Sequence, residues 1–449
     1  MQTTLQKYAS RAVPRYTSYP TAPHFRPGFD ALTYRGWLAA ADPGEPISLY
    51  LHVPFCKQMC WYCGCNMKLA ARYEPVHAYV QNLIREIELV AEALPLRMQV
   101  AHLHWGGGTP TALSPDDLTR VMQVIDRHFT ILPDAELAIE SDPRTLTDAM
   151  ILRLGELGFN RASFGVQEFD PEVQQAINRI QPPEMVEGTV DALRAAGIER
   201  INFDLIYGLP YQTTEKLLTT IDRAAAMRPD RIALFGYAHV PWMAKNQRMI
   251  PEDALPDATE RARQAESAGE ALQALGYEAI GLDHFALPAD PLAAAARAGR
   301  LHRNFQGYTT DTQETLIGVG ATSIGRTAEG YVQNITETGA WTRAVRAGVL
   351  PVAKGIALSA DDRLRAHVIE RIMCDGTVDT EAVARRFNVA ADWAKAELDS
   401  LAALEADGIL ERQSGRITLT PEARPLSRLV AAAFDTYLQS GRAKHSAAV

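Results

Sequence analysis

Residues 47–65 read ISLYLHVPFCKQMCWYCGC, an apolar run that leads directly into a loop holding four of the chain's five cysteines. The run at 47–53 has the length of a buried β-strand and is closed by a proline. The cysteines are Cys56, Cys60, Cys63 and Cys65. Because thiolates are soft ligands, this density predicts a zinc or iron–sulfur site. A disulfide pair or a set of buried thiols is the alternative without a metal.

The spacing of the cysteines favours an iron–sulfur cluster over structural zinc. Structural zinc sites usually have paired Cys-x2-Cys knuckles separated by a longer segment. Here the ligands share one loop at three-then-two spacing, and no second knuckle follows. Three thiolates around a four-iron cube leave one iron without a protein ligand, and chemistry can take place at that iron.

Beyond the loop, β-like runs alternate with amphipathic helical stretches. Strands are predicted at 47–53, 101–105, 135–140, 161–166, 200–206 and 231–237, and helices at 76–94, 115–129, 147–157, 184–196 and 214–227. Ser114 before Pro115 is the expected N-cap of the second helix. Six βα units imply a parallel sheet with right-handed crossovers. Periodicity also allows a doubly wound sheet. A partial (β/α)6 TIM-like barrel is favoured because the unusual residues follow the carboxyl ends of the strands.

The length of 449 residues allows two to three domains. We predict an N-terminal arm at 1–45, a barrel core at 46–290, a barrel extension and connector at 291–354, and a mostly helical, winged-helix-like domain at 355–449. That last segment holds 12 Lys and Arg against 14 Asp and Glu. A DNA-binding winged helix should be basic, so a lid or packing role is favoured.

Charge and hydrophobicity exclude several classes of function. The net charge of −9 argues against a general binder of nucleic acids or anionic membranes. No run of eighteen apolar residues occurs, and residues 1–16 are polar and basic, so neither a membrane span nor a secretory signal is expected. Clustered cysteines without such a signal indicate a reducing compartment, so we expect a cytoplasmic protein.

Other candidate residues follow the later strands. The run GGGTP at 106–110 follows the second strand, and its glycines let backbone groups approach a polar ligand closely. Glu140 ends the third strand and could accept hydrogen bonds from both hydroxyls of a ribose; a salt-bridged strand end is the alternative. Gln167 and Arg179 follow the fourth strand, and Asp204 lies within the fifth. These three need partners or a ligand, and a buried polar network is the alternative.

The Cys-x3-Cys-x2-Cys loop after a first strand, with a glycine-rich turn after the second, resembles the radical S-adenosylmethionine superfamily. The resemblance implies a [4Fe–4S] cluster on Cys56, Cys60 and Cys63. The amine and carboxylate of S-adenosylmethionine would occupy the open iron. An electron from the cluster would then cleave the sulfonium to a 5′-deoxyadenosyl radical, and this chemistry belongs to the cofactor.

More of the chain resembles the oxygen-independent coproporphyrinogen III oxidase family. The matching segments are 15–21, 54–56, 63–66, 104–111, 202–210, 302–310 and 363–374. This resemblance implies oxidative decarboxylation of two propionates of coproporphyrinogen III to vinyl groups, giving protoporphyrinogen IX in heme biosynthesis. The radical would abstract a β-hydrogen, and the substrate radical would then lose an electron and CO2. The family expectation is a monomer with an electron donor for the cluster and a separate electron acceptor.

The resemblance also assigns binding roles. The residues expected to contact the cluster-bound cofactor are Tyr50, Tyr62, Gly107, Glu140 and Ile324. Those expected around a second S-adenosylmethionine are Gly108, Thr109, Gln167, Arg179, Asp204 and Ala238. Cys65 matches a family cysteine that is not a cluster ligand, so its role stays open. A substrate with four carboxylates calls for guanidinium and aromatic contacts, for which Arg15, Tyr16 and Tyr19 are candidates.

Two other functions were weighed against this one. A heme chaperone with the same radical fold would bind heme without decarboxylation, but such relatives usually lack the N-terminal arm and the fourth cysteine, and this chain has both. A winged-helix redox regulator is disfavoured by the acidic balance of residues 355–449 and by the six-unit barrel.

Overall fold

The computed structural model describes residues 7, 8, 11 and 13–438. These residues form two compact units. The first, here called the barrel unit, comprises residues 25–256 and 311–357. The second, here called the helical unit, comprises the residues before 25 together with 257–310 and those from 358 onward.

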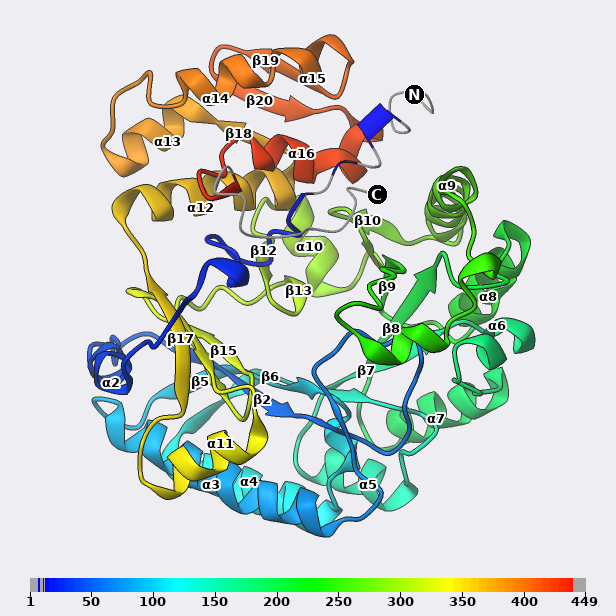
Figure 1. The fold of residues 1–449 in the computed structure, drawn as a ribbon, viewed down its shortest axis with the longest axis vertical. Coiled ribbons are helices and arrows are strands. Elements are labelled where there is room, and N and C mark those ends of the chain that lie inside the picture. Colours follow the sequence, from blue (N-terminus) through cyan, green and yellow to red (C-terminus); the bar gives the residue numbers. More distant parts are fainter. Residues whose placement is uncertain (1–6, 9–10, 12, 439–449) are drawn as a thin grey trace. The chain divides into compact units, whose positions relative to one another are not determined.

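The barrel unit is built on six neighbouring parallel strands (Figure 1). In spatial order these are β2 (Ile47–Val53), β5 (Gln99–Gly107), β6 (Thr130–Ser141), β7 (Arg161–Gln167), β8 (Arg200–Tyr207) and β9 (Arg231–Gly236). Spatial order follows chain order, as expected when each strand is joined to the next by a helical crossover. All six predicted strands are present, and the predicted partial (β/α)6 architecture is confirmed.

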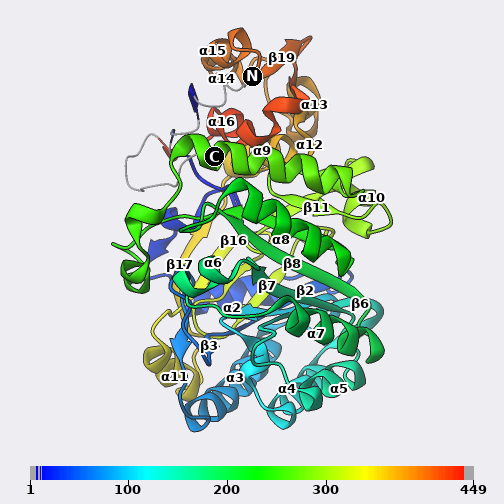
Figure 2. The same cartoon turned by 90° about the vertical axis from the view of Figure 1, so that its right-hand side faces the viewer.

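Helices cover the outer face of this sheet (Figure 2). They are α3 (Glu74–Ala93), α4 (Pro115–His128), α5 (Asp148–Glu156), α6 (Pro171–Ala176), α7 (Pro183–Ala195) and α8 (Thr214–Ala226), and α2 (Ala31–Ala39) precedes the first strand. The Ser114 hydroxyl accepts a hydrogen bond from the Asp117 N–H at 3.2 Å, which confirms it as the N-cap of α4. Leu83 of α3, Val121 of α4 and Leu103 of β5 are all fully buried, so the apolar faces of the helices and the sheet form the core.

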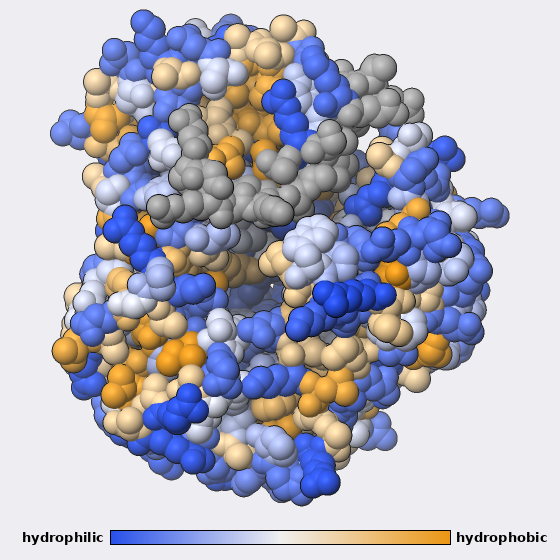
Figure 3. Space-filling view, viewed as in Figure 1, coloured by the Kyte–Doolittle hydropathy of each residue, from blue (hydrophilic) through white to orange (hydrophobic). Residues whose placement is uncertain are grey.

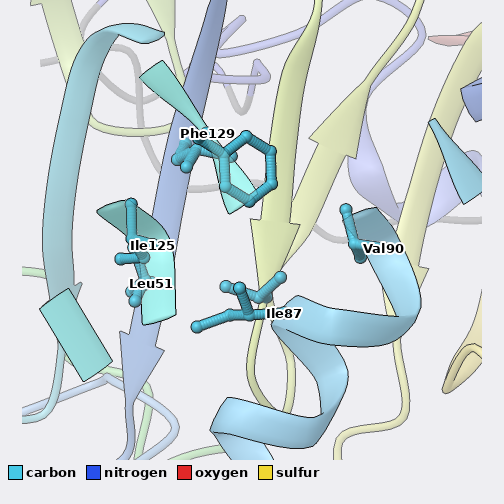
Figure 4. Close-up of a pocket in the computed structure, with 7 residues that line it drawn as sticks. Leu51, Ile87, Val90, Ile125 and Phe129 are labelled. Atoms are coloured by element: carbon cyan, nitrogen blue, oxygen red, sulfur yellow. The ribbon is translucent and has the colours of Figure 1, made fainter. Parts of the chain in front are cut away.

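A small cavity of about 10 Å³ lies beside β2, between the sheet and the helices that cover it (Figure 4). Its lining is entirely apolar and consists of Leu49, Leu51, Ile87, Val90, Ile125, Phe129 and Val319. A cavity of this size without polar groups holds neither a ligand nor a bound water. It is therefore part of the core.

The sheet continues beyond β2 with strands that the sequence patterns did not predict. β14 (Leu316–Val319) is parallel to β2, and β15 (Ile324–Arg326), β16 (Gly330–Asn334), β17 (Val352–Ala357) and β1 (Arg26–Pro27) follow in antiparallel order. The helix α11 (Thr338–Arg346) lies between β16 and β17 in the chain. Glu86 of α3 ties this region to the barrel, since it accepts hydrogen bonds from the Gly320 N–H at 2.7 Å and the Trp341 indole at 2.9 Å.

The helical unit contains small antiparallel sheets among short helices. Its helices are α9 (Ala258–Ala274), α10 (Pro291–Arg297), α12 (Ala360–Asp375), α13 (Thr380–Phe387), α14 (Lys395–Ser400), α15 (Ala402–Ala406) and α16 (Ser427–Ala432). Its strands are β10 (Glu278–Ile280), β11 (His284–Ala286), β12 (His302–Asn304), β13 (Gly307–Thr309), β18 (Thr377–Asp379), β19 (Leu410–Gln413) and β20 (Arg416–Leu419). The predicted C-terminal hairpin is present as β19 and β20, with β18 added on the other side of β20.

Part of the N-terminal arm belongs to the core of the helical unit. Tyr8, Val13, Tyr16 and Tyr19 are buried in one cluster with Val368 and other residues of the C-terminal segment. The described part of the arm is therefore packed structure.

Within the described residues, no helix is both long enough and apolar enough to cross a bilayer. On the face drawn in Figure 3, hydrophobic and hydrophilic residues are interspersed over much of the surface, and some hydrophobic residues gather near the top of the view. Single exposed apolar residues are normal on globular proteins.

Candidate active site at the carboxyl ends of the parallel strands

The cysteine loop begins where β2 ends and is held from several directions. The short strands β3 (Phe55–Cys56) and β4 (Lys68–Leu69) pair at its base. Across the loop, the Asn246 side-chain amide donates to the carbonyl oxygens of Cys60 at 3.2 Å and Cys63 at 2.8 Å. Gln247 donates to the Tyr62 carbonyl at 2.7 Å. These bonds fix the loop backbone and so direct its side chains.

The three predicted ligands have different polar surroundings. The Cys56 sulfur lies 3.4 Å from the Thr109 hydroxyl. The buried Cys60 sulfur accepts hydrogen bonds from the guanidinium of Arg144 at 3.2 Å and from that of Arg179 at 3.3 Å. The Cys63 sulfur accepts the backbone N–H of Cys65 at 3.4 Å. Donors of this kind stabilise negative charge on sulfur.

The cysteine thiols are close enough to influence one another's ionisation. Burial raises the pKa of Cys56 to about 11, and the neighbouring sulfurs of Cys63 and Cys60 add to this effect against the hydrogen bond from Thr109. A hydrogen bond with Cys65 lowers the pKa of Cys63 to about 7. Such mutual repulsion between thiolates is relieved when a metal cluster binds them.

The glycine-rich turn after β5 packs directly against the start of this loop. The Gly108 N–H donates to the Val53 carbonyl and the Thr109 N–H to the Phe55 carbonyl, both at 2.8 Å. A Cβ atom at Gly108 would lie 2.8 Å from the Phe55 oxygen, so only glycine fits there. These two N–H groups attach the turn to the end of β2 and to the start of the cysteine loop.

Glu140 lies at the centre of a polar group at the ends of β2, β5 and β6. Its carboxylate accepts hydrogen bonds from the Gly107 N–H at 3.1 Å and the His104 ring at 3.2 Å. Burial alone would raise the pKa of Glu140, but these donors lower it below its usual value. Its side chain is still 39% exposed, so carboxylate oxygen remains available to a ligand.

Two more of the predicted cofactor residues lie beside Glu140. Tyr50 of β2 is opposite His104 in the sheet register, and the two rings stack with centroids 5.9 Å apart. Gly318 of β14 is paired with Tyr50 on the other side, and a Cβ at Gly318 would lie 2.7 Å from the Ile324 carbonyl oxygen. Tyr50, Glu140 and Ile324 are thus brought to one region of the sheet edge.

The residues predicted for a second cofactor follow β7 and β8. Gly165 and Asp204 are opposite each other in the register, and Arg179 donates to the Gly165 carbonyl at 3.0 Å through Nε. Gln167 ends β7 with φ +66°, a conformation that is uncommon for a residue other than glycine and is often found at functional sites. Arg179 belongs to a buried network, which was the alternative interpretation for this residue.

Asp204 differs from Arg179 because its carboxylate has no hydrogen bond from any residue that the structure describes. Burial and the nearby charge of Glu140 raise the pKa of Asp204 to about 7, and Arg179 opposes the shift. A half-buried carboxylate without a donor is a candidate for ligand binding.

The last two predicted cofactor residues are at the cysteine loop and after β9. Tyr62 packs with Trp61 against a cluster that includes Val173 and Ile177. The Ala238 carbonyl accepts a hydrogen bond from Gln247, the same side chain that holds the Tyr62 carbonyl. One amide therefore links both positions.

Several residues of this site were not predicted from the sequence. Arg144 donates to the Cys60 sulfur and forms an ion pair with Asp142 at 2.6 Å, and Asp142 lies 3.4 Å from Arg179. Asp142 and Arg144 come just after β6, the strand that carries Glu140. Their position after the carboxyl end of a strand was the sequence signal that could have identified them. Asn246 had no such signal, because it meets Cys60 across 186 positions of the chain.

Comparison with known proteins decides the family. Residues 50–224 match the Radical SAM superfamily and residues 358–426 match the HemN C-terminal domain. A protein of Bradyrhizobium diazoefficiens named oxygen-independent coproporphyrinogen III oxidase is 49% identical to this chain, over 98% of both chains. This chain belongs to the oxygen-independent coproporphyrinogen III oxidase family.

Other relatives agree with this assignment to the oxygen-independent coproporphyrinogen III oxidases. A Paracoccus denitrificans protein of the same name is 45% identical over 97% of this chain and 96% of its own length. The solved structure described as coproporphyrinogen III oxidase (HemN) from Escherichia coli, a radical SAM enzyme, superposes with a TM-score of 0.91 at 38% identity. That match covers 94% of this chain and 97% of the other.

Membership of the radical SAM superfamily implies a [4Fe–4S] cluster and S-adenosylmethionine, and the residues present fit that cluster. In the described part of the chain, no three His, Cys, Asp or Glu side chains converge as ligands of a single metal ion. A cube differs from a single ion because each thiolate binds a separate iron. The sulfurs of Cys56, Cys60 and Cys63 are close enough for their charges to interact. Two arginines donate hydrogen bonds to the Cys60 sulfur, and their positive charge suits an anionic cluster.

Proposed function

We propose that this protein catalyses the oxygen-independent oxidative decarboxylation of two propionate side chains of coproporphyrinogen III to vinyl groups, giving protoporphyrinogen IX in heme biosynthesis. The observation that carries the proposal is the position of Cys56, Cys60 and Cys63. They lie on a braced loop at the carboxyl ends of the parallel strands, in a chain matched end to end by oxidases. The full-length match to oxidases also favours this function over a heme chaperone.

When bound, the cluster and S-adenosylmethionine supply the one-electron chemistry that oxidises the propionates. The chain's own residues hold and orient these groups. Cys56, Cys60 and Cys63 are the proposed ligands of the cluster. Arg144 and Arg179 donate to the Cys60 sulfur and so offset the cluster's negative charge. The Cys65 N–H donates to Cys63, and we assign Cys65 this supporting position without a ligand role.

The cluster-bound cofactor is assigned to the group around Glu140. Its exposed carboxylate oxygen can accept hydrogen bonds from ribose hydroxyls, and His104 and Gly107 keep it ionised. Tyr50 lies on β2, and Ile324 lies on β15, which is separated from β2 by β14. Tyr62 and Gly107 complete the proposed contact set.

A second S-adenosylmethionine is assigned to the neighbouring region around Asp204. The residues proposed for it are Gly108, Thr109, Gln167, Arg179, Asp204 and Ala238. The support for this assignment is the carboxylate of Asp204, which has no donor within the described chain, and the left-handed backbone of Gln167 beside it. A ribose or amine could supply the missing donors.

The remaining parts of the proposal concern the setting of the reaction. The enzyme acts in the cytoplasm as a monomer, receives an electron for its cluster from a reduced donor, and passes the electrons of the substrate to a separate acceptor. The net charge of −9 supports the absence of nucleic acid from this scheme.

The test is anaerobic reconstitution of the full chain with iron, sulfide, S-adenosylmethionine, a chemical reductant and coproporphyrinogen III. The expected result is protoporphyrinogen IX together with 5′-deoxyadenosine. Heme binding without either product would establish the chaperone function instead. If a protein with a full cluster showed neither turnover nor heme binding, both the oxidase function and the chaperone function would be refuted.

A further inference from the structure

The helical unit contains a guanidinium group with unused hydrogen-bond donors. Arg303 of β12 is half-buried, and its Nε and Nη1 atoms are buried without a hydrogen-bond partner among the residues that the structure describes. Its Nη2 atom makes only a long contact of 3.4 Å with the Arg15 carbonyl oxygen. The guanidinium carbon lies 4.4 Å from the centre of the Tyr308 ring. One face of the group is therefore covered, and two of its nitrogens lack an acceptor.

Two more arginines lie in the same region, so positive charge is concentrated there. Arg428 is buried and donates to the Pro14 carbonyl at 2.9 Å and to the Val13 carbonyl. Burial and the charges of Arg15 and Arg303 lower the pKa of Arg428 to about 10. Arg15 is exposed at the surface of this unit.

Asp283 is the carboxylate that faces this group. Its Oδ1 atom lies 2.7 Å from Nδ1 of the neighbouring His284 ring, which is hydrogen-bond distance. Burial opposes ionisation, but His284, Arg303 and Arg15 lower the pKa of Asp283, so it is charged. This carboxylate does not reach the Nε and Nη1 atoms of Arg303, and neither does Glu370, which accepts a hydrogen bond from the Arg303 backbone N–H at 3.3 Å.

The aromatic residues of the arm play a different part from the one the sequence suggested. Tyr16 is 4% exposed and its hydroxyl donates to Asp435 at 3.0 Å, and Tyr19 is 2% exposed with its hydroxyl 3.0 Å from that of Thr436. Both hydroxyls are used inside the core. They fix the arm on the C-terminal side of Arg15, and of the three arm residues only Arg15 is exposed to a ligand.

We propose that Arg303 and Arg15 form a carboxylate-binding site that holds a propionate side chain of the substrate. The inference rests on the proposed function, because that function supplies a ligand with four carboxylates. Burying guanidinium nitrogens without acceptors is costly. A carboxylate can bind Nη1 and Nη2 together at the end of the guanidinium, or Nε and Nη2 at its side, so Nη2, which has only the 3.4 Å contact, takes part in either pair. Arg428 adds positive charge from behind without contact to the ligand, and Tyr308 keeps the plane of Arg303 fixed.

The test compares ligands that differ only in their carboxylates. Coproporphyrin III is the air-stable tetracarboxylate, and its tetramethyl ester has the same macrocycle without charge. Both are titrated by fluorescence into the reconstituted full chain. The variants are Arg303→Gln, Arg303→Lys and Arg15→Gln. Arg300→Gln is the matched control, because Arg300 is an exposed arginine three positions away and loses the same charge.

We expect Arg303→Gln to weaken binding of coproporphyrin III by about tenfold to a hundredfold, the loss typical of a charge-assisted hydrogen bond, and to leave ester binding unchanged. Arg303→Lys should recover part of the affinity, and Arg300→Gln should match the wild type. In turnover, KM for coproporphyrinogen III should rise with little change in kcat. Arg15 is exposed, so Arg15→Gln should fold normally. It should weaken binding of coproporphyrin III severalfold and leave binding of the ester unchanged.

Other results would overturn the site. Binding of the acid by Arg303→Gln and by Arg15→Gln within twofold of the wild type would mean that water satisfies Arg303. Equal losses for acid and ester would mean that Arg303 acts through packing alone. A wild-type protein that binds the acid through Arg303 but yields no protoporphyrinogen would overturn the proposed function and keep the site. Normal turnover with unchanged KM in Arg303→Gln would overturn only the site.

Discussion

The two ends of the parallel sheet in the barrel unit differ in whether their buried charged side chains have hydrogen-bond partners. Near the amino ends, Arg161 is 2% exposed and donates to Glu136 at 3.0 Å and to Asn202 at 2.8 Å. Nearby, Ser48 donates to Asp311 at 2.6 Å. Near the carboxyl ends, Asp204 has no hydrogen bond from any described residue. The same strands therefore carry a closed polar network at one end and unused binding capacity at the other.

Two carboxylates show the difference most directly. Burial would raise the pKa of Glu136, but Arg161, Arg231 and His102 lower it to about 2. Burial raises the pKa of Asp204 to about 7, and the neighbouring Glu140 adds to that shift. The two pKa values move in opposite directions although both residues belong to the same sheet. Glu136 is surrounded by cations, whereas Asp204 lies near a second carboxylate, that of Glu140. Stability is built at the amino ends, and ligand binding is left to the carboxyl ends.

The largest effect is expected at the cluster. Cys60→Ala removes the proposed cluster ligand whose sulfur accepts hydrogen bonds from Arg144 and Arg179, so reconstituted protein should lose most of its bound iron and all measurable activity. Cys374→Ala is the matched control, because Cys374 is a buried cysteine in the core of the helical unit. It should keep full iron and activity. Iron and sulfide analysis with product assay measures both. A Cys60→Ala protein with normal iron and turnover would remove the basis of the assignment.

The next effect belongs to the amino ends. Arg161→Met leaves the carboxylate of Glu136 buried without its main cation, and breaking one partner of a buried pair costs about 3–5 kcal/mol. We expect the free energy of unfolding to fall by that amount in denaturant titration. Folded Arg161→Met should still take up a full cluster. Unchanged stability would show that Arg200, 3.6 Å from Glu136, is sufficient to hold the charge.

The sequence predicted the features that depend on neighbouring residues and missed those that depend on residues far apart in the chain. β2 was predicted with its observed bounds, because apolar runs between amphipathic helices are local signals. Strands such as β15, with three residues, carry too little pattern to be seen. The pattern of residues at the strand ends marked Glu140, and the spacing of the cysteine motif marked the three proposed cluster ligands. The contacts of Asn246 with the cysteine loop depend on how distant loops meet in the fold, and no local pattern encodes them.

Asp204→Asn should change stability in the direction opposite to Arg161→Met, and the change should depend on pH. The folded pKa of Asp204 is about 7, above the value of about 4 for an unfolded aspartate, so folding favours the protonated form. Between these values the wild type loses stability as pH rises, and above pH 7 the full penalty is present. Asparagine cannot ionise and escapes this penalty.

The thermal midpoint of Asp204→Asn should therefore exceed that of the wild type at pH 8, and the difference should shrink toward zero near pH 4. Anaerobic scans without S-adenosylmethionine measure it. The same variant should bind fewer S-adenosylmethionine molecules than the wild type at equilibrium. A midpoint below that of the wild type at pH 8 would mean that Asp204 is stabilised by its surroundings, and the contrast with Glu136 would be lost.

The smallest effect concerns how closely the carboxyl-end site is fitted together. A Cβ at Gly106 would lie 2.7 Å from Glu140 Oε1, so Gly106→Ala must push the carboxylate away from His104 and the Gly107 N–H. We expect KM for S-adenosylmethionine to rise severalfold with unchanged cluster content. Gly64→Ala is the control within the cysteine loop, since nothing lies within 4 Å of its new methyl group. Because the displaced atom belongs to a side chain that can rotate, the loss of stability should be only about 1 kcal/mol, the size of one hydrogen bond. If Gly106→Ala and Gly64→Ala gave the same KM, Glu140 would not touch the cofactor, and its two donors would make it part of a closed network like that at the amino ends.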